Sequence, residues 1–175
     1  MKTQNETERR TKSNARARHL QANAAEMDAL VDGLNHDLAG EYQAVLMYTH
    51  YSAMLTGPYR PELRALFQAE IADELRHAQF LADKVAALGG VPTVEPSPVP
   101  HADGPLEMLE AALAAEKRAI ADYDARVGQA ESCNDIGLKV HLENQVADET
   151  RHMEELQRII AGWTARPAEA VVVNP

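Results

Sequence analysis

Two short stretches of this sequence, "DELRH" at 73–77 and "DETRH" at 148–152, repeat one arrangement of an aspartate, a glutamate, an arginine and a histidine. Side chains three residues apart lie on the same face of a helix, so each stretch presents its glutamate beside its histidine. One such turn is common on a solvated helix surface, whereas two copies with matching flanks predict a shared chemical role. The residues concerned are Glu74, His77, Glu149 and His152.

Four long helical patterns surround these stretches, between about residue 26 and residue 163. Breakers separate them at 56–61, 89–105 and 128–134. The first breaker is short, so the first two helices are expected to be antiparallel neighbours. The second holds five prolines. It is long enough to run the length of the bundle, which would start the third helix at the far end, parallel to the second.

The third breaker predicts two helix caps. Gly128 is expected to end the third helix, and Ser132 or Asn134 to begin the fourth, because these residue types are preferred at those positions. The predicted fold class is therefore all-α: a four-helix bundle with a long crossover between the second and third helices.

Each helical pattern carries a seam of residues at steps of three and four, the spacing of helices that pack in a bundle. The seams are apolar except near their middles. Because the polar positions lie near the midpoints of their helices, they are expected to meet at one height in the core, whichever way each helix runs. These positions hold Glu41, Glu74, Glu116 and Glu149.

Four converging carboxylates require a counter-charge. Burying even one unpaired carboxylate costs several kcal/mol after relaxation, so the group must be protonated or bound to cations. The alternative is that the glutamates are solvated and that the faces are phased wrongly, and this has to hold on all four helices at once.

Two Glu-x-x-His turns plus two single glutamates match the donor set of di-iron and di-manganese bundle sites. Hard oxygen donors with a few nitrogens suit Fe or Mn better than a metal that prefers thiolates. Four carboxylates balance two divalent ions and leave other coordination positions open to oxygen or peroxide. Zinc would fit chemically but would do no redox work. The predicted metal ligands are Glu41, Glu74, His77, Glu116, Glu149 and His152.

Residues around these ligands form a predicted second layer. Asp73 and Asp148 are candidates to accept a hydrogen bond from the outer N–H of a ligand histidine, on their own helix or a facing one. Arg76 and Arg151 would anchor these aspartates, unless all four merely solubilise the flank of the seam. Tyr48, on the first seam, is a candidate to supply an electron or a hydrogen bond; the alternative is a core tyrosine with a satisfied hydroxyl.

Length and composition restrict the number of domains, the cellular compartment and the classes of partner that we expect. The 175 residues are about one domain long, and no apolar run approaches the ~20 residues that span a bilayer. The first twenty residues lack the apolar segment of a secretory signal, and one cysteine, Cys133, fits a reducing cytosol. The net charge of −10 argues against general nucleic-acid binding, although the first twenty residues are basic. We expect a flexible N-terminal arm at 1–25, the bundle at 26–163 and a tail at 164–175.

Four segments resemble the ferritin-like superfamily, and most of all bacterioferritin. They are "LAGEYQAVLMY", "DELRHAQFLADKVAALGGVP", "LAAEKRAIADY" and "ADETRHMEEL", in that order and at similar separations. The resemblance covers about Leu30 to Ile160. It implies that Glu74 and Glu149 bridge two metals and that Tyr48 lies beside the centre. The remaining implied ligands are Glu41 and Glu116 as terminal carboxylates, with His77 and His152 on one metal each.

Other positions depart from the family pattern. Leu75 stands where bacterioferritin has its haem-ligating methionine, so haem is not expected. Ala69 stands where an inner-surface histidine would be, and no fifth helix is evident. Ala119 replaces the extra glutamate of rubrerythrin, whose Cys-x-x-Cys iron site is also missing. A homo-oligomer is expected, as a dimer, a 12-subunit shell or a 24-subunit cage.

The resemblance implies a ferroxidase that oxidises Fe(II) with oxygen or hydrogen peroxide, for iron storage or detoxification. One alternative is a non-storage di-iron or di-manganese peroxidase or oxygenase of rubrerythrin-like type. Another is a Dps-like DNA-protecting shell that uses the basic leader. The expected cofactors are two Fe ions, with Mn as the alternative, and neither membrane association nor general nucleic-acid binding is expected.

Overall fold

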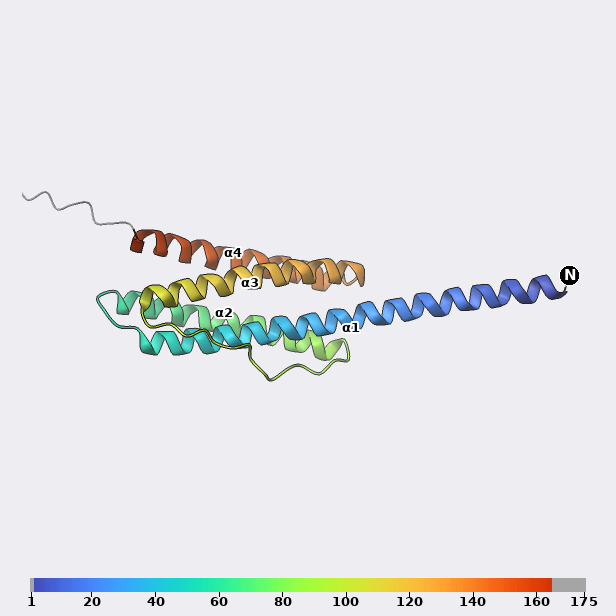
Figure 1. The fold of residues 1–175 in the computed structure, drawn as a ribbon, viewed down its shortest axis with the longest axis horizontal. Coiled ribbons are helices and arrows are strands. Elements are labelled where there is room, and N and C mark those ends of the chain that lie inside the picture. Colours follow the sequence, from blue (N-terminus) through green and yellow to red (C-terminus); the bar gives the residue numbers. More distant parts are fainter. Residues whose placement is uncertain (1, 165–175) are drawn as a thin grey trace, which may run out of the picture.

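The computed structural model describes the backbone of residues 2–164 and the side chains of residues 23–163. Within that range the regular structure is helical, and the predicted all-α bundle is confirmed (Figure 1). None of the helices in this described part is both long and apolar enough to cross a membrane. The four helices are α1 (Lys2–Met54), α2 (Arg60–Ala87), α3 (Pro105–Ser132) and α4 (Ile136–Thr164).

The first helix is longer than its packed part. Its N-terminal portion projects beyond the other three helices (Figure 1), and among the side chains that the structure describes, Met27 and Leu30 are the first of α1 to pack against the core. The division into an arm at 1–25 and a bundle at 26–163 stays a prediction. The side chains of residues 1–22 and the tail residues 165–175 lie outside the described residues.

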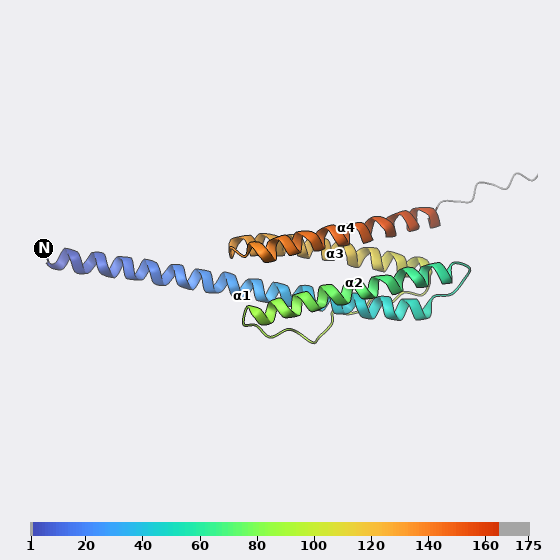
Figure 2. The same cartoon turned by 180° about the vertical axis from the view of Figure 1, so that it is seen from behind.

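The helices pack as two antiparallel pairs, α1 with α2 and α3 with α4, joined mainly through α1 and α3. Figure 2, from behind, shows α2 and α4 on the side opposite the crossover. The third helix starts where α1 ends and runs parallel to α2, as predicted from the length of the second breaker (Figure 1).

The crossover between α2 and α3 lies along α1 and is attached to it by hydrogen bonds at successive positions. The Asn35 amide donates to the Val91 carbonyl at 3.1 Å, and the Ser97 N–H donates to the Ala39 carbonyl at 2.8 Å. Further along, the Tyr51 hydroxyl donates to the Pro100 carbonyl at 2.7 Å. Because prolines cannot donate through their own nitrogen, most of these bonds run from side-chain donors of α1 to carbonyl oxygens of the crossover.

The turn between α3 and α4 differs from the prediction. The third helix continues through Gly128 to Ser132, so Gly128 is not its C-cap. Asn134 takes a left-handed conformation with φ of 57°, which asparagine tolerates better than most residues. The cap of α4 is Asp135, whose Oδ1 accepts the Leu138 N–H at 3.0 Å. A glycine inside a helix carries no local signal that separates it from a cap.

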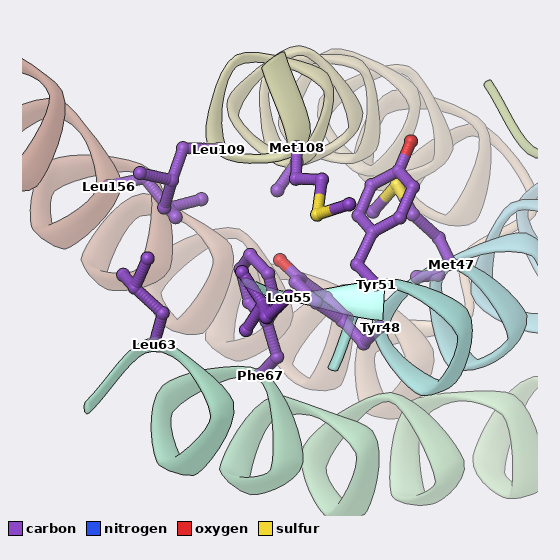
Figure 3. Close-up of a cluster of buried hydrophobic side chains, with 11 residues drawn as sticks. Met47, Tyr48, Tyr51, Leu55, Leu63, Phe67, Met108, Leu109 and Leu156 are labelled. Atoms are coloured by element: carbon purple, nitrogen blue, oxygen red, sulfur yellow. The ribbon is translucent and has the colours of Figure 1, made fainter. Parts of the chain in front are cut away.

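Two apolar clusters fill the bundle on either side of the polar midpoints. Figure 3 shows the first, in which Tyr48 and Phe67 lie 5.5 Å apart between ring centroids, with Leu109 and Leu156 beyond them. Burying a leucine or phenylalanine side chain stabilises the fold by about 1.5–3 kcal/mol, so the two clusters hold the polar layer in place. The second cluster is built around Leu30, Leu34, Leu38, Leu81, Val85, Leu138 and Leu142.

A buried ion pair joins α1 to α3 near the second cluster. Arg126 Nε lies 3.3 Å from Asp37 Oδ2, and the two side chains are 13% and 2% exposed. The guanidinium passes over Gly33, where an added Cβ would lie 1.6 Å from Arg126 Nη1. A glycine at this position therefore allows the arginine to reach the aspartate.

Replacing Gly33→Ala is expected to lower the free energy of unfolding by about 2–4 kcal/mol. Disrupting a buried ion pair costs about 3–5 kcal/mol, while alanine gains about 1 kcal/mol over glycine in a helix. Urea denaturation measures the difference. Gly40→Ala is the matched control, because apart from its own stretch of helix backbone no described atom lies within 4 Å of its added Cβ. A Gly33→Ala protein as stable as the control would contradict this account.

Candidate metal centre

The six predicted ligand side chains meet between the two apolar clusters. Each is 7% exposed or less, so the reading of these residues as solvated is wrong. All four helices contribute, and Glu-x-x-His turns on α2 and α4 each supply a carboxylate and an imidazole. The six are Glu41, Glu74, His77, Glu116, Glu149 and His152.

The side chains form two overlapping sets of ligand atoms. Glu41 and His77 complete one set, and Glu116 and His152 complete the other. Within each set, one ligand atom from every residue lies within 4.8 Å of the others. Glu74 and Glu149 belong to both sets, so two ions held by these sets would share these two carboxylates. A third group of possible ligand atoms joins Glu70, Asp73 and His152 beside the second set.

Both histidines turn Nδ1 toward the centre. His77 Nδ1 lies 2.7 Å from Glu149 Oε1, and His152 Nδ1 lies 3.3 Å from Glu149 Oε2. Glu149 therefore sits between the two imidazoles. Since Nδ1 of each ring faces the carboxylates, Nδ1 is the atom that each histidine offers to a metal.

The outer nitrogens face acidic side chains on the opposite helix. His77 Nε2 lies 4.0 Å from Asp148 Oδ2, and His152 Nε2 lies 3.6 Å from Asp73 Oδ2. Arg76 is paired with Asp73, and Arg151 Nη1 donates to Asp148 at 2.8 Å. The structure thus brings each predicted aspartate to a histidine of the facing helix. An acceptor on the outer nitrogen fixes the orientation of a metal-binding imidazole.

Glu70 is a neighbour of the site that sequence reasoning missed. Its Oε2 lies 3.2 Å from His152 Nε2, closer than Asp73 does. Its position on the α2 seam, one turn before Glu74, could have predicted that it lies beside the ligands. The corresponding residue of α4, Gln145, instead donates to the Tyr123 hydroxyl at 3.3 Å. The two histidines therefore have different surroundings.

Two buried tyrosines hold the terminal glutamates. The Tyr48 hydroxyl donates to Glu116 Oε1, and the Tyr123 hydroxyl donates to Glu41 Oε1. Tyr48 therefore bonds across to α3 rather than to the glutamate of its own helix. Tyr123 was missed as a site residue, although it follows Glu116 by the same seven positions that separate Tyr48 from Glu41.

Protons and hydrogen bonds balance the charge of the metal-free cluster. Burial first, and then the charges of Glu41 and Glu149, raise the pKa of Glu74 well above its ordinary value. Burial also raises the pKa of Glu116. Burial alone would raise the pKa of Glu149, but hydrogen bonds from His152 and His77 lower it overall.

Burial acts on the pKa of the two histidines in the opposite direction to its effect on the carboxyl groups. Burial lowers the pKa of both, but the hydrogen bond and negative charge of Glu149 raise the pKa of His77 and His152 overall. These shifts favour the ionised form of Glu149, the protonated forms of Glu74 and Glu116, and the charged forms of the two histidines. Metals of the right charge would displace these protons.

A cavity of about 460 Å³ adjoins the cluster. It lies between α1, α3 and the crossover, and Glu41, Glu74, Glu116 and Glu149 form part of its wall. Asp37 also lines it, and burial raises the pKa of this carboxyl to about 7 even though Arg126 lowers it.

The fold and the cluster together define a class of protein: a four-helix bundle that holds a dinuclear carboxylate and histidine site in its core. The ferritin model, described as a ferritin-like domain, matches residues 31–164. This chain therefore belongs to the ferritin family of ferritin-like proteins, and the resemblance seen in the sequence is confirmed.

Individual relatives agree with this placement. The bacterioferritin BfrA of Mycobacterium tuberculosis is 31% identical over 125 residues, 71% of this chain and 79% of that protein. A ferritin-like, diiron-carboxylate protein of Bacillus anthracis superposes with a TM-score of 0.77 at 47% identity, over 77% of this chain and 97% of that one. Rhodobacter capsulatus bacterioferritin, at 23% identity, shares the fold with a TM-score of 0.71 over 78% and 86% of the chains.

Removing metal with a chelator is expected to leave a protein that loses stability as pH rises from 5.5 to 8. Glu74 and Glu116 have folded pKa values above the ordinary 4.5, so the folded state holds protons that the unfolded chain releases. The raised pKa values of His77 and His152 act in the same direction, because their stabilisation is lost as pH rises. The melting temperature should fall by roughly 5 °C or more.

The matched variants separate this effect from general charge repulsion. Glu74→Gln with Glu116→Gln should flatten the pH dependence, whereas the same change at exposed Glu110 and Glu143 should not. Equal slopes in the two double variants would show that the buried carboxyls are not its source.

Proposed function

We propose that this protein is a di-iron ferroxidase that oxidises Fe(II) with oxygen or hydrogen peroxide, for iron storage or detoxification. The observation that carries the proposal is the pair of ligand sets that share Glu74 and Glu149. The likeness to bacterioferritins and to a diiron-carboxylate protein supports iron as the metal. The acidic net charge of −10 favours attraction of Fe(II).

Each side chain has a distinct part in this proposal. Glu41 and His77 would hold one ion, and Glu116 and His152 would hold the other. Glu74 and Glu149 would be shared between them, and all six side chains would have to give up any proton on a ligand atom. When bound, the two Fe(II) ions supply one electron each to the oxidant. The donor set also fits Mn, which remains the alternative metal.

The surrounding residues orient the ligands rather than bind metal. Tyr48 and Tyr123 donate to Glu116 and Glu41, which would leave the other oxygen of each carboxylate free to hold an ion. Asp73, Asp148 and Glu70 face the outer nitrogens of the histidines and keep Nδ1 directed inward. Tyr48 as an electron donor stays a prediction.

A second candidate is a non-storage di-metal peroxidase or oxygenase. The cavity beside the cluster favours it, since a volume of about 460 Å³ is of the size that accommodates a small molecule. The absence of haem, a homo-oligomeric state, a cytoplasmic location and the Dps-like shell stay predictions. The leader side chains on which DNA binding would depend lie outside the described residues.

Repeated anaerobic loading and aeration should distinguish storage from a resident centre. For the ferroxidase, each cycle is expected to oxidise the added Fe(II) and to leave Fe(III) in an iron-rich assembly, measured by iron content after gel filtration. A protein that stops at two ions per chain, with no further turnover, would favour the second candidate.

Glu74→Ala combined with Glu149→Ala is expected to abolish metal-dependent oxidation, a loss of roughly a hundredfold or more. Loss of an outer-shell partner alone costs about 10–100-fold, and these residues are bridging ligands. Stopped-flow absorbance after mixing with Fe(II) measures the rate, and circular dichroism checks that the helices remain. Exposed Glu110→Ala with Glu143→Ala is the matched control. Undiminished oxidation in the first variant would contradict the assignment.

A further inference from the structure

A groove separate from the metal centre lies at the end of the bundle where α2 begins and α4 ends (Figure 1). It has a volume of about 730 Å³ and shares no residue with the cavity beside the ligands. We call it the end groove. Its lining consists of Tyr59, Glu62, Leu63, Leu66, Glu155, Ile159, Gly162 and Trp163.

The end groove is mainly apolar. Leu63 belongs to the first apolar cluster, and Leu66, Ile159 and Trp163 pack against that cluster. The rings of Tyr59 and Trp163 lie edge to face with centroids 5.3 Å apart, so an aromatic pair links the two helices. Tyr59 is nevertheless 58% exposed. A segment that covers these side chains would remove apolar surface from water, which is favourable.

The residues that follow α4 supply such a segment. The tail, residues 165–175, lies outside the described residues, and it begins two positions after Trp163. Its sequence, "ARPAEAVVVNP", contains three consecutive valines, Val171–Val173. Valine favours extended backbone, and Pro167 disfavours a continuation of α4. The sequence therefore favours an extended apolar segment close to the apolar groove.

The tail is long enough to turn back along the groove. An extended chain spans up to about 3.3–3.6 Å per residue, so the seven steps from Thr164 to Val171 reach up to about 23–25 Å. The groove follows α2 from Tyr59 to Leu66, a rise of about 10 Å along a helix. Gly162 leaves room on α4, because apart from its own stretch of helix backbone no described atom lies within 4 Å of its added Cβ.

The charges of the groove and the tail are complementary. Glu62 and Glu155 line the groove and are exposed. Arg166 is the only lysine or arginine of the tail. Exposed ion pairs contribute little to affinity, so the apolar contact is the main attraction and the charges favour one direction of the tail.

The short connection to α4 favours the chain's own tail over a second copy. A segment on a short flexible linker has an effective concentration in the millimolar range. A second copy at micromolar concentration would have to bind about a thousandfold more tightly to displace it.

We propose that the tail docks in the end groove of its own chain as an extended segment. Val171–Val173 cover the leucines of α2 and Ile159 of α4, and Arg166 faces the two glutamates of the lining. The docked tail closes the first apolar cluster at this end of the bundle. It uses no residue of the metal centre, so the proposal does not depend on the function proposed above.

The fluorescence of Trp163 tests the proposal, because this residue lines the groove and is the only tryptophan of the chain. In the metal-free full-length protein, replacing Val171→Ser, Val172→Ser and Val173→Ser together should shift the emission to longer wavelength and raise the acrylamide quenching constant. Serine keeps the length of the tail and removes its apolar contact. Val91→Ser with Val94→Ser, at crossover valines that are 84% and 82% exposed, is the matched control and should change neither quantity.

An added peptide tests whether the same contact forms without the connection. A peptide with the sequence of residues 165–175 should return the emission of the triple variant to that of the parent protein. Half of the effect is expected at about millimolar concentration, the effective concentration of the tethered segment. The same peptide with serine at the three valine positions should have no effect.

Two results would overturn the proposal. An unchanged emission and quenching constant in the triple variant would show that the tail does not cover Trp163. A parent emission that moves to longer wavelength on dilution would assign the groove to a second copy of the chain. A parent emission that does not depend on protein concentration, together with the shift in the triple variant, is the result that docking of the chain's own tail predicts.

Discussion

The structure depends on the burial of four carboxylates and two imidazoles in the middle of a helical core, which is unfavourable in free energy unless these groups are paired. Unpaired, these groups would oppose folding by several kcal/mol each. The protein meets this cost through cross-helix hydrogen bonds, in which Tyr48 and Tyr123 hold Glu116 and Glu41. Glu149 lies between two histidines. The two apolar clusters above and below then fix the height at which the groups meet.

The two halves of the bundle repeat one another around this layer. In each, a terminal glutamate is followed seven residues later by a tyrosine that bonds to the other half, and a Glu-x-x-His turn supplies a shared carboxylate and a histidine. The repeat is broken where the surroundings differ. Asp37 and Gly40 on α1 correspond to Ala112 and Ala115 on α3. Since Ala112 has no carboxylate, the ion pair between Asp37 and Arg126 has no counterpart at this position of α3.

The sequence predicted the bundle, the crossover and the meeting of the six site residues because each depends on features local to one helix. Periodicity identifies the buried face, and the midpoint of a helix sets a height that does not depend on direction. The partners across helices were harder to predict. Whether Tyr48 reaches Glu116 or Glu41 depends on how α1 and α3 rotate about their axes, which one helix cannot specify.

The other features that the sequence did not predict also depend on contacts between helices or on turn geometry. Glu70 lay on the predicted seam, but its contact with His152 depends on the spacing between α2 and α4. Asp37 carried no signal until Arg126 and Gly33 were placed beside it. At the turn between α3 and α4, the same glycine can end a helix or continue it, and the end is decided by Asn134 and the Asp135 cap.

The central claim is that two metal ions share the bridging carboxylates Glu74 and Glu149. Anomalous diffraction at the iron edge, from crystals loaded anaerobically with Fe(II), tests it most directly. The account predicts two peaks in the core, one beside His77 and Glu41 and the other beside His152 and Glu116. A single peak, or peaks only outside the bundle core, would contradict it.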